Sequence, residues 1–426
     1  MFDPYIILIS VSILVALSYV FDLASKKFKI PSVLFLLATG IIIKQIADIY
    51  SFSFGDNFNT YLQFIGVIGL IMIVLEAAVD LNLSREKVPL VQKSLLLAIL
   101  VLILSSISIG YVLMKLTGEP FFNSLVNAIP LSVVSSAVLI PSVHTLTQNK
   151  KEFLIYESTF SDIIGIMFFN FIVLQESDIF TLSGFTNIIV TIILSVIVSF
   201  VLVFFFSRIK TEVKIFLMIS ILAVLYSIGK QFHLSSLLMI FIFGIVLNNA
   251  RQVFLGWLGR NVSFKSIDHM KKDFRTITGE TAFLVRTFFF VAFGMSIDLN
   301  SLLDLNIILI GSIIVVILYL VRYLNFKIFL KTDVFPEIFL APRGLITILL
   351  FFQIPAIYQI EDFMGILFFV ILATGIIMMI ALVTTKESEV EGFTVVDFGL
   401  GPASDHANVD VIGKFSEFDD LEETED

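Results

Sequence analysis

The chain has no cysteine, so disulfides, thiolate metal sites and cysteine nucleophiles are all excluded. It has only four histidines, none at the spacing of a metal-ligand pair. A P-loop, a Rossmann fingerprint and a nucleophile elbow are also missing, so the chain has no evident means of coupling nucleotide hydrolysis to another process. We therefore expect neither an enzyme nor a bound cofactor.

Charged residues are also scarce, at 15%, whereas 58% of the 426 residues are hydrophobic. The mean hydropathy of +1.01 does not fit a water-soluble globular domain. The first apolar run, Tyr5 to Val20, has no basic region before it and no small-residue cleavage site after it, which favours a retained helix over a signal peptide. The composition predicts an all-α polytopic membrane protein.

Negative charge is concentrated at one end of the chain. Residues 386–426 hold 13 Asp and Glu against two Lys, although the net charge of the whole chain is only −9. Such a tail is expected to be a solvated cytoplasmic extension. An arm that senses a ligand or binds a partner is the alternative.

The apolar runs predict thirteen transmembrane helices, at about 20 residues per bilayer crossing. They lie near 4–20, 31–46, 60–79, 94–116, 121–145, 152–174, 185–207, 213–230, 234–250, 278–298, 303–326, 334–356 and 361–384.

Lysine and arginine gather in alternate connecting loops, as they do on the cytoplasmic side of membrane proteins. The basic loops include ASKKFK, SREKVPLVQK, QNKKE and SRIKTEVK, whereas the loops between them carry almost no basic charge. This pattern predicts a multi-pass protein of the cell (inner) membrane, with its N-terminus outside and its acidic tail in the cytoplasm.

The thirteen segments divide into six, one and six, and the two halves would enter the membrane from opposite sides. Such inverted repeats are typical of transporters and often carry broken helices at matching positions. The fifth segment of the first half contains Pro130 and Pro141, and that of the second contains Pro342, Arg343 and Gly344. Each proline removes a helical hydrogen bond. We expect a pair of broken helices here, with ordinary proline kinks as the alternative.

Few ionisable side chains fall inside the predicted spans, where an unpaired charge is costly. Away from helix ends they are Glu76, Glu157, Asp162, Arg286, Arg322 and Arg343. Glu76 is expected either to pair in helix packing or to line a cavity. Arg286 lies near the start of its segment and is expected to snorkel to the interface, with a functional role as the alternative.

The run ESTFSD, residues 157–162, presents two facets of one helix. Glu157 and Ser161 share one face, and Ser158 and Asp162 share the next. Asp162 and Ser158 would offer hard oxygen ligands to a partly dehydrated alkali cation. Glu157 could either form an architectural ion pair with Arg322 or ligate an ion directly.

The run ESTFSD resembles the E-S-x-x-N-D motif of the NhaP/NHE-like branch of the monovalent cation/proton antiporter superfamily. LAPRGLIT resembles the arginine-glycine motif of that branch, and LEAAVDL and FFFVAFGMSIDL are similar to further stretches of it. The likeness covers nearly all of residues 1–385. It implies an NhaA-like antiporter fold with crossed broken helices.

The resemblance also implies roles for single residues. Asp162 would bind the cation and the proton in turn, with Ser158 as a further ligand of Na+ or K+. Glu157 would pair with Arg322, and Arg343 would complete this structural group at the break. Glu76 corresponds to a carboxylate near the ion site of some members.

Two positions depart from the family pattern. Ser161 replaces the asparagine before the aspartate, and the T-D-P of the first broken helix aligns with Val134, Ser135 and Ser136. Ser135, Ser136 and Ser161 are therefore candidate ion ligands in a site with fewer carboxylates. We expect a weaker field at the cation, which could lower cation affinity or favour K+ over Na+.

The resulting hypothesis is a secondary antiporter that exchanges Na+ or K+, with Li+ as a further candidate, for H+ by competition at Asp162. One titrating carboxylate predicts electroneutral exchange. A core near 94–174 and 303–384 would move against a dimerisation bundle near 4–79 and 213–298, in a homodimer, with residues 386–426 outside the transmembrane domain. A gated cation channel on the same scaffold and a membrane sensor acting through the tail are the alternatives.

Overall fold

The structure is a computed structural model, and it describes residues 4–50, 58–80, 87–143, 146–174, 182–208, 214–231, 236–254, 264–297, 304–329, 334–361 and 363–385. All regular elements of these residues are helices. The acidic tail, residues 386–426, lies outside the described residues, so the expectations about it stay predictions.

Among the described residues, seven helices are long and apolar enough to cross a membrane. These spans lie within α1 (Pro4–Phe28), α2 (Ser32–Ile49), α4 (Val88–Thr117), α5 (Phe121–Ser132) with its continuation to Ser142, α13 (Phe264–Met295), α14 (Leu305–Phe329) and α16 (Phe363–Thr384). The structure therefore shows an all-helical, multi-pass membrane protein. The predicted total of thirteen spans and the inverted repeat go beyond this finding.

Other helices complete the described fold. They are α3 (Phe58–Asp80), α6 (Ser136–Leu139), the 3-10 turn η2 (Ile140–Ser142), α7 (Gln148–Leu174), α8 (Leu182–Arg208), α9 (Lys214–Gln231), α10 (Ser236–Asn248), α11 (Ala250–Val253), α15 (Leu345–Phe352) and the 3-10 turn η4 (Ala356–Tyr358). The helix α7, which carries both Glu157 and Asp162, is buried along most of its length.

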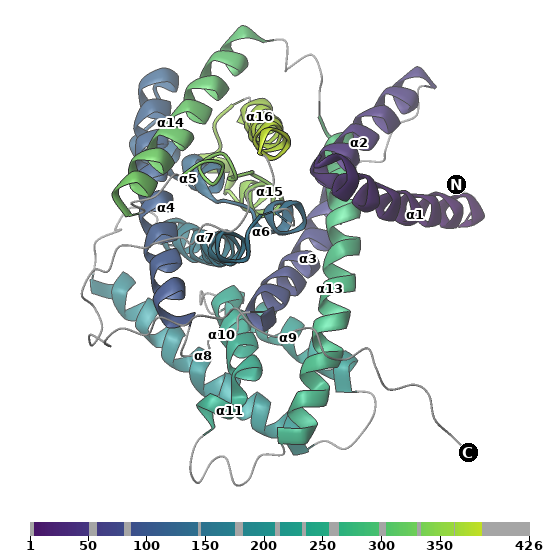
Figure 1. The fold of residues 1–426 in the computed structure, drawn as a ribbon, viewed down its shortest axis with the longest axis vertical. Coiled ribbons are helices and arrows are strands. Elements are labelled where there is room, and N and C mark those ends of the chain that lie inside the picture. Colours follow the sequence, from purple (N-terminus) through teal and green to yellow (C-terminus); the bar gives the residue numbers. More distant parts are fainter. Residues whose placement is uncertain are drawn as a thin grey trace, which may run out of the picture.

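The helices pack in two neighbouring groups. In one, α4 packs against α5, α7 and α14, while α16 packs against α14. In the other, α13 packs against α2 and α3, and α10 packs against α3 and α8. Figure 1 shows the short helices α6 and α15 close to α5 and α7, with α13 running past them from top to bottom. The division into a moving core and a dimerisation bundle is not tested by this packing and stays a prediction.

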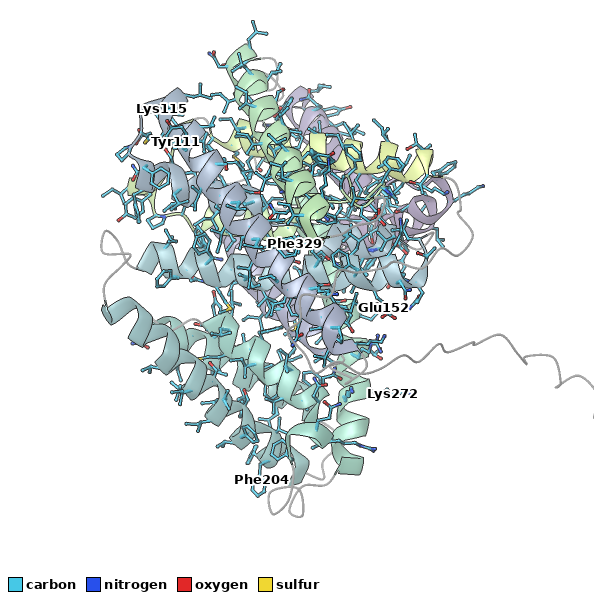
Figure 2. The ribbon with its side chains drawn as sticks, turned by 60° about the vertical axis from the view of Figure 1, so that its left-hand side comes forward. Tyr111, Lys115, Glu152, Phe204, Lys272 and Phe329 are labelled. Atoms are coloured by element: carbon cyan, nitrogen blue, oxygen red, sulfur yellow. The ribbon has the colours of Figure 1, made fainter. Side chains whose placement is uncertain are left out.

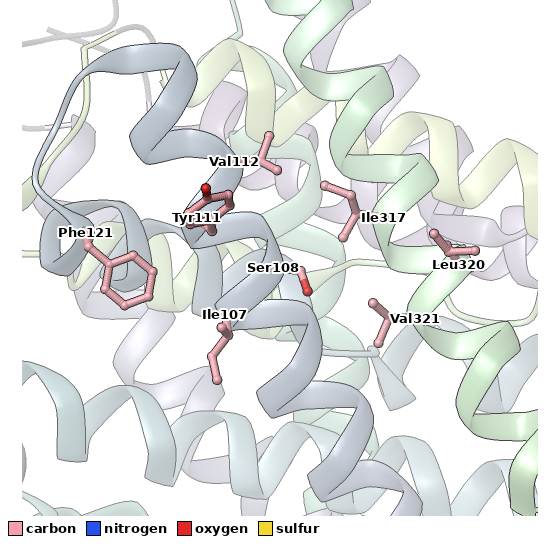
Figure 3. Close-up of a pocket in the computed structure, with 8 residues that line it drawn as sticks. All are labelled: Ile107, Ser108, Tyr111, Val112, Phe121, Ile317, Leu320 and Val321. Atoms are coloured by element: carbon pink, nitrogen blue, oxygen red, sulfur yellow. The ribbon is translucent and has the colours of Figure 1, made fainter.

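The outward faces are apolar. Leu104, Ile107, Val316, Leu320 and Ile380 are all exposed on α4, α14 and α16, where hydrocarbon rather than water is the solvent expected for a bilayer-spanning helix. A groove of about 480 Å³ lies on this surface between α4 and α14 (Figure 3). It is lined by Ile107, Ser108, Tyr111, Val112, Phe121, Ile317, Leu320 and Val321, so none of the candidate site residues contributes to it.

Several segments differ from the predicted boundaries, and two of them differ substantially. The segment expected at 278–298 begins earlier, because α13 starts at Phe264 and its first turns are polar. Figure 2 shows Lys115 of α4 in the upper part of the molecule and Lys272 of α13 in the lower half. Counting apolar residues locates only the bilayer-crossing part of a helix, and polar residues can continue the same helix outside it.

The segment expected at 334–356 is helical only from Leu345 to Phe352, within α15. Residues 335–339 form turns and residues 340–344 have no regular structure. Pro336, Pro342 and Gly344 fall in this stretch, and proline and glycine both disfavour a helix interior. The second broken helix is therefore half helix and half irregular backbone.

Candidate functional site

The first break in the membrane-spanning helices separates α5 from α6. Pro130 lies inside the last turns of α5, which ends at Ser132, and Val133 and Ser135 have extended backbone angles. An extended segment inside a membrane protein exposes N–H groups that need other partners. The neighbouring elements supply these partners.

Three successive N–H groups at this break donate to two neighbouring elements. Val134 donates to Oγ of Ser161 at 2.9 Å, and Ser135 donates to the carbonyl of Pro342 at 2.9 Å. Ser136 donates to Oδ2 of Asp162 at 3.0 Å. The break is thus held by α7 on one side and by the second broken segment on the other.

Asp162 is buried, with 4% of its surface exposed. Its Oδ2 also accepts a hydrogen bond of 2.5 Å from the hydroxyl of Ser136. Among the described residues its Oδ1 has no hydrogen-bond partner. One carboxylate oxygen is therefore fixed by the first broken helix, while the other has unused acceptor capacity.

The two broken helices touch where Gly344 precedes α15. A Cβ atom built on Gly344 would lie 2.6 Å from Oγ of Ser135 and 2.6 Å from Cγ2 of Val138. Any larger residue would push the two segments apart. A similar approach brings α7 to the first break, because a Cβ on Gly165 would lie 2.4 Å from Cγ2 of Val133.

Arg343 is buried beside this crossing. Its Nε donates to the carbonyl of Leu131 at 2.8 Å, Nη2 to that of Ser132 at 3.5 Å and Nη1 to that of Ala341 at 2.5 Å. Its own N–H donates to Oγ1 of Thr374 at 3.1 Å. The last carbonyls of a helix have no partner within the helix and carry its negative pole, so a cation is favourable there. Arg343 therefore does not pair with a carboxylate as expected for the structural group of Glu157 and Arg322, and instead binds carbonyls at the end of α5.

The structure brings Glu157 and Arg322 together. Nη1 of Arg322 lies 2.5 Å from Oε1 of Glu157, and Nη2 lies 2.8 Å from Oε2. Arg322 also donates to the carbonyls of Glu337 and Leu340 and lies 4.3 Å from the ring centroid of Phe326. This bidentate pair ties α7 to α14.

The serines predicted as cation ligands differ in how they contact the first break and Asp162. Ser136 and Ser161 contact the break directly, and the buried Oγ of Ser135 has no hydrogen-bond partner in the part of the chain that the structure describes. Ser158 donates to the carbonyl of Ile155 on its own helix at 3.2 Å, and no hydrogen bond joins it to Asp162. The sequence pattern favoured Ser158 over Ser136 as the neighbour of Asp162, and in this structure the reverse holds.

Glu76 forms an ion pair with Arg286, with Oε1 and Nη2 3.7 Å apart. The expectation that Arg286 snorkels to the interface is wrong, because it lies deep within α13 and points to other helices. The predicted segment 278–298 places Arg286 near its start, and residue spacing along one helix does not reveal its contacts with α3 and α6.

Glu337 was missed at the sequence level. Its side chain is fully buried, and its Oε1 lies 2.6 Å from Nζ of Lys150 at the start of α7. Apart from this ion pair, neither carboxylate oxygen has a hydrogen-bond partner among the described residues. Glu337 lies near the start of the predicted span 334–356, so a search restricted to charges away from helix ends does not find it. An acidic residue next to an apolar run, as in PEIFLAPRG, is the signal that points to it.

A buried carboxylate beside two interrupted membrane helices is a feature of secondary transporters. The family comparison agrees with this class: the model for the sodium/hydrogen exchanger, transmembrane, matches residues 11–385. The chain therefore belongs to the sodium/hydrogen exchanger family. This is a family of membrane transporters rather than enzymes, and membership supports cation/proton antiport.

Solved structures show the same fold. The sodium proton antiporter MjNhaP1 from Methanocaldococcus jannaschii, determined at pH 8, matches with a TM-score of 0.69 and 19% identity, covering 88% of this chain and 98% of that one. An electron-microscopy map structure of MjNhaP1 matches with a TM-score of 0.61 and 18% identity, covering 90% and 95%. A comparison with curated proteins found no match.

Proposed function

We propose that this protein exchanges a monovalent cation, Na+ or K+, for H+ by competition at Asp162. The observation that carries the proposal is the asymmetry of this buried carboxylate: Ser136 donates twice to Oδ2, while Oδ1 has no partner among the described residues. A proton on the carboxylate and a cation beside it neutralise the same charge. The site therefore holds one or the other, and this competition couples the two fluxes.

The proposed cation ligands are oxygens around the first break. They comprise Asp162 with the hydroxyls of Ser135, Ser136, Ser158 and Ser161. Ser135 supports this proposal best, because no described residue forms a hydrogen bond with its buried Oγ. Ser158 and Ser136 would have to turn from their present acceptors, and Glu76 would act near the site through its charge. Li+ is a further candidate substrate.

We propose electroneutral exchange, one cation for one proton. Both oxygens of Glu157 are engaged by the terminal nitrogens of Arg322, so we assign Glu157 to the structural pair rather than to the exchange reaction. The residue before Asp162 is Ser161, not a second carboxylate. Only one carboxylate at the break is then free to change its charge during the cycle.

The larger scaffold is part of the same proposal. Thirteen spans in two inverted repeats would place the broken helices at the centre of a core, which moves against a dimerisation bundle in a homodimer. The N-terminus would lie outside an inner membrane and the tail in the cytoplasm. Support comes from the contact between Ser135 and Pro342, which joins the two broken segments across the predicted repeat.

The experiment is proton flux in proteoliposomes after addition of Na+, K+ or Li+. The wild type should respond to at least one cation, and Asp162→Asn should abolish the response. Asp48→Asn, the same change at an exposed residue of α2, is the matched control and should keep it. A cation response that survives in Asp162→Asn would refute the mechanism. An imposed membrane potential should leave the rate unchanged, and a potential-driven rate would refute electroneutrality.

A further inference from the structure

The short helix α6 contains a carbonyl that its own backbone cannot satisfy. The N–H of Ile140 donates to the carbonyl of Ser136, so the next helical bond would run from residue 141 to the carbonyl of Ala137. Residue 141 is proline, which has no N–H to donate. The carbonyl of Ala137 therefore needs a donor from elsewhere.

Arg286 of α13 supplies that donor. Its Nη1 lies 3.3 Å from the carbonyl oxygen of Ala137, and its Nε donates to the carbonyl of Ala282 on its own helix at 3.2 Å. Its Nη2 lies 3.7 Å from Oε1 of Glu76 on α3. The fork of the guanidinium thus joins three helices, and the planar group is held by contacts at each of its nitrogens.

The carbonyl that Arg286 binds is next in sequence to the residue that holds Asp162. Ser136 is the first residue of α6 and gives both its N–H and its hydroxyl to Oδ2 of Asp162. The position of these two donors depends on the position and orientation of α6, because Ser136 is its first residue. A loosened α6 would move Ser136 away from the carboxylate.

We infer that Arg286 is a positioning residue for the exchange site. Arg286 donates to the carbonyl of Ala137, which lacks a helical donor because residue 141 is proline. Glu76 orients the guanidinium of Arg286 and neutralises its charge. The inference rests on the proposed function, because it assigns Arg286 a role in cation binding at Asp162. It also gives Glu76 a role that differs from direct cation ligation, since the carboxylate acts through the arginine.

The arrangement predicts a specific rescue. Arg286→Met removes the donor and keeps most of the side-chain volume, so it should raise the KM for the cation about ten-fold, the order expected for an unsatisfied buried acceptor. Turnover at saturating cation should change much less. Pro141→Ala restores an N–H at position 141, so Arg286→Met in that background should raise KM less than two-fold relative to Pro141→Ala alone.

Arg286→Gln is a second, milder variant that keeps the inference testable if Arg286→Met does not fold. It keeps an N–H donor without the charge, so its KM should lie between those of the wild type and Arg286→Met. Glu76→Gln removes the ionic partner of Arg286 but keeps the donor to Ala137, so it should raise KM by less than Arg286→Met does. Equal effects of Arg286→Met with and without Pro141→Ala, or an unchanged KM, would overturn the inference.

Hydrogen–deuterium exchange of residues 134–140 separates this inference from the proposed function. Arg286→Met should speed amide exchange in this segment, and Pro141→Ala should restore protection. If the wild type shows no cation-driven proton flux, the proposed function fails, and this measurement still decides whether Arg286 holds α6. Flux with unchanged protection and unchanged KM would refute the positioning role alone.

Discussion

The buried pair of Glu157 and Arg322 gives an asymmetric prediction. Replacing Arg322 with methionine leaves the Glu157 carboxylate buried without the two hydrogen bonds that it accepts here. Replacing Glu157 with glutamine leaves a guanidinium that still donates to the carbonyls of Glu337 and Leu340 and stacks on Phe326. The arginine change should therefore be the more damaging of the two.

The magnitudes follow from what each variant leaves behind. An uncompensated buried charge costs about 3–5 kcal/mol, which is the loss expected for Arg322→Met. Glu157→Gln also leaves a buried charge, the guanidinium of Arg322, but this group keeps its backbone carbonyl acceptors, so the loss should be smaller, about 1–3 kcal/mol. The double variant Glu157→Gln with Arg322→Met removes both charges, so it should be more stable than Arg322→Met alone.

The assay is the fraction of protein that stays monodisperse in detergent after heating, measured by size-exclusion chromatography over a range of temperatures. Lys87 and Glu152 provide a matched control, since their side chains are 40% and 22% exposed at a distance of 2.8 Å. Lys87→Met and Glu152→Gln should each cost about 0–1 kcal/mol.

Two results would refute this reasoning. One is a Glu157→Gln variant as unstable as Arg322→Met, and the other is a double variant that is no better than Arg322→Met alone. The double variant also distinguishes an architectural pair from an ion ligand. If Glu157 serves architecture, the double variant should exchange cations with the wild-type KM.

Two further predictions concern the second broken segment. Gly344→Ala should destabilise the protein by about 1–3 kcal/mol and slow transport, because its Cβ would lie 2.6 Å from Oγ of Ser135. The control is Gly279→Ala, whose Cβ would meet nothing closer than 3.8 Å. Equal thermal stability of the two variants would count against close contact between the two broken helices. Lys150→Met should destabilise the protein more than Glu337→Gln, because it leaves the fully buried Glu337 carboxylate without its cation. In Glu337→Gln, by contrast, the partly exposed Lys150 can reach water. The same heating assay measures both variants, and the reverse order of stability would contradict this account of the pair.

Helical periodicity and the cost of buried charge were enough to find part of this site. Asp162 and Glu157 stand out because carboxylates inside apolar helices need a partner or a cavity. The prolines predicted where the helices break. The family motif implied that Arg322 is the partner of Glu157, and the structure places the two in contact.

The rest depends on backbone that does not follow a helical period. Ser158 shares a helix face with Asp162, yet Ser136 reaches the carboxylate because the extended residues before α6 release its N–H group. Arg343 and Arg286 bind carbonyls freed by a helix end and by a proline. Such partners depend on tertiary packing, which residue spacing along one helix does not contain.

The central claim is that a proton and a cation compete for Asp162. The most direct test is the release of protons into weakly buffered detergent solution when Na+ or K+ is added to the purified protein. Wild-type protein should release protons in proportion to the cation bound, and Asp162→Asn should release none, while Asp48→Asn should behave as the wild type. Cation binding without proton release in the wild type, or undiminished release in Asp162→Asn, would contradict the account.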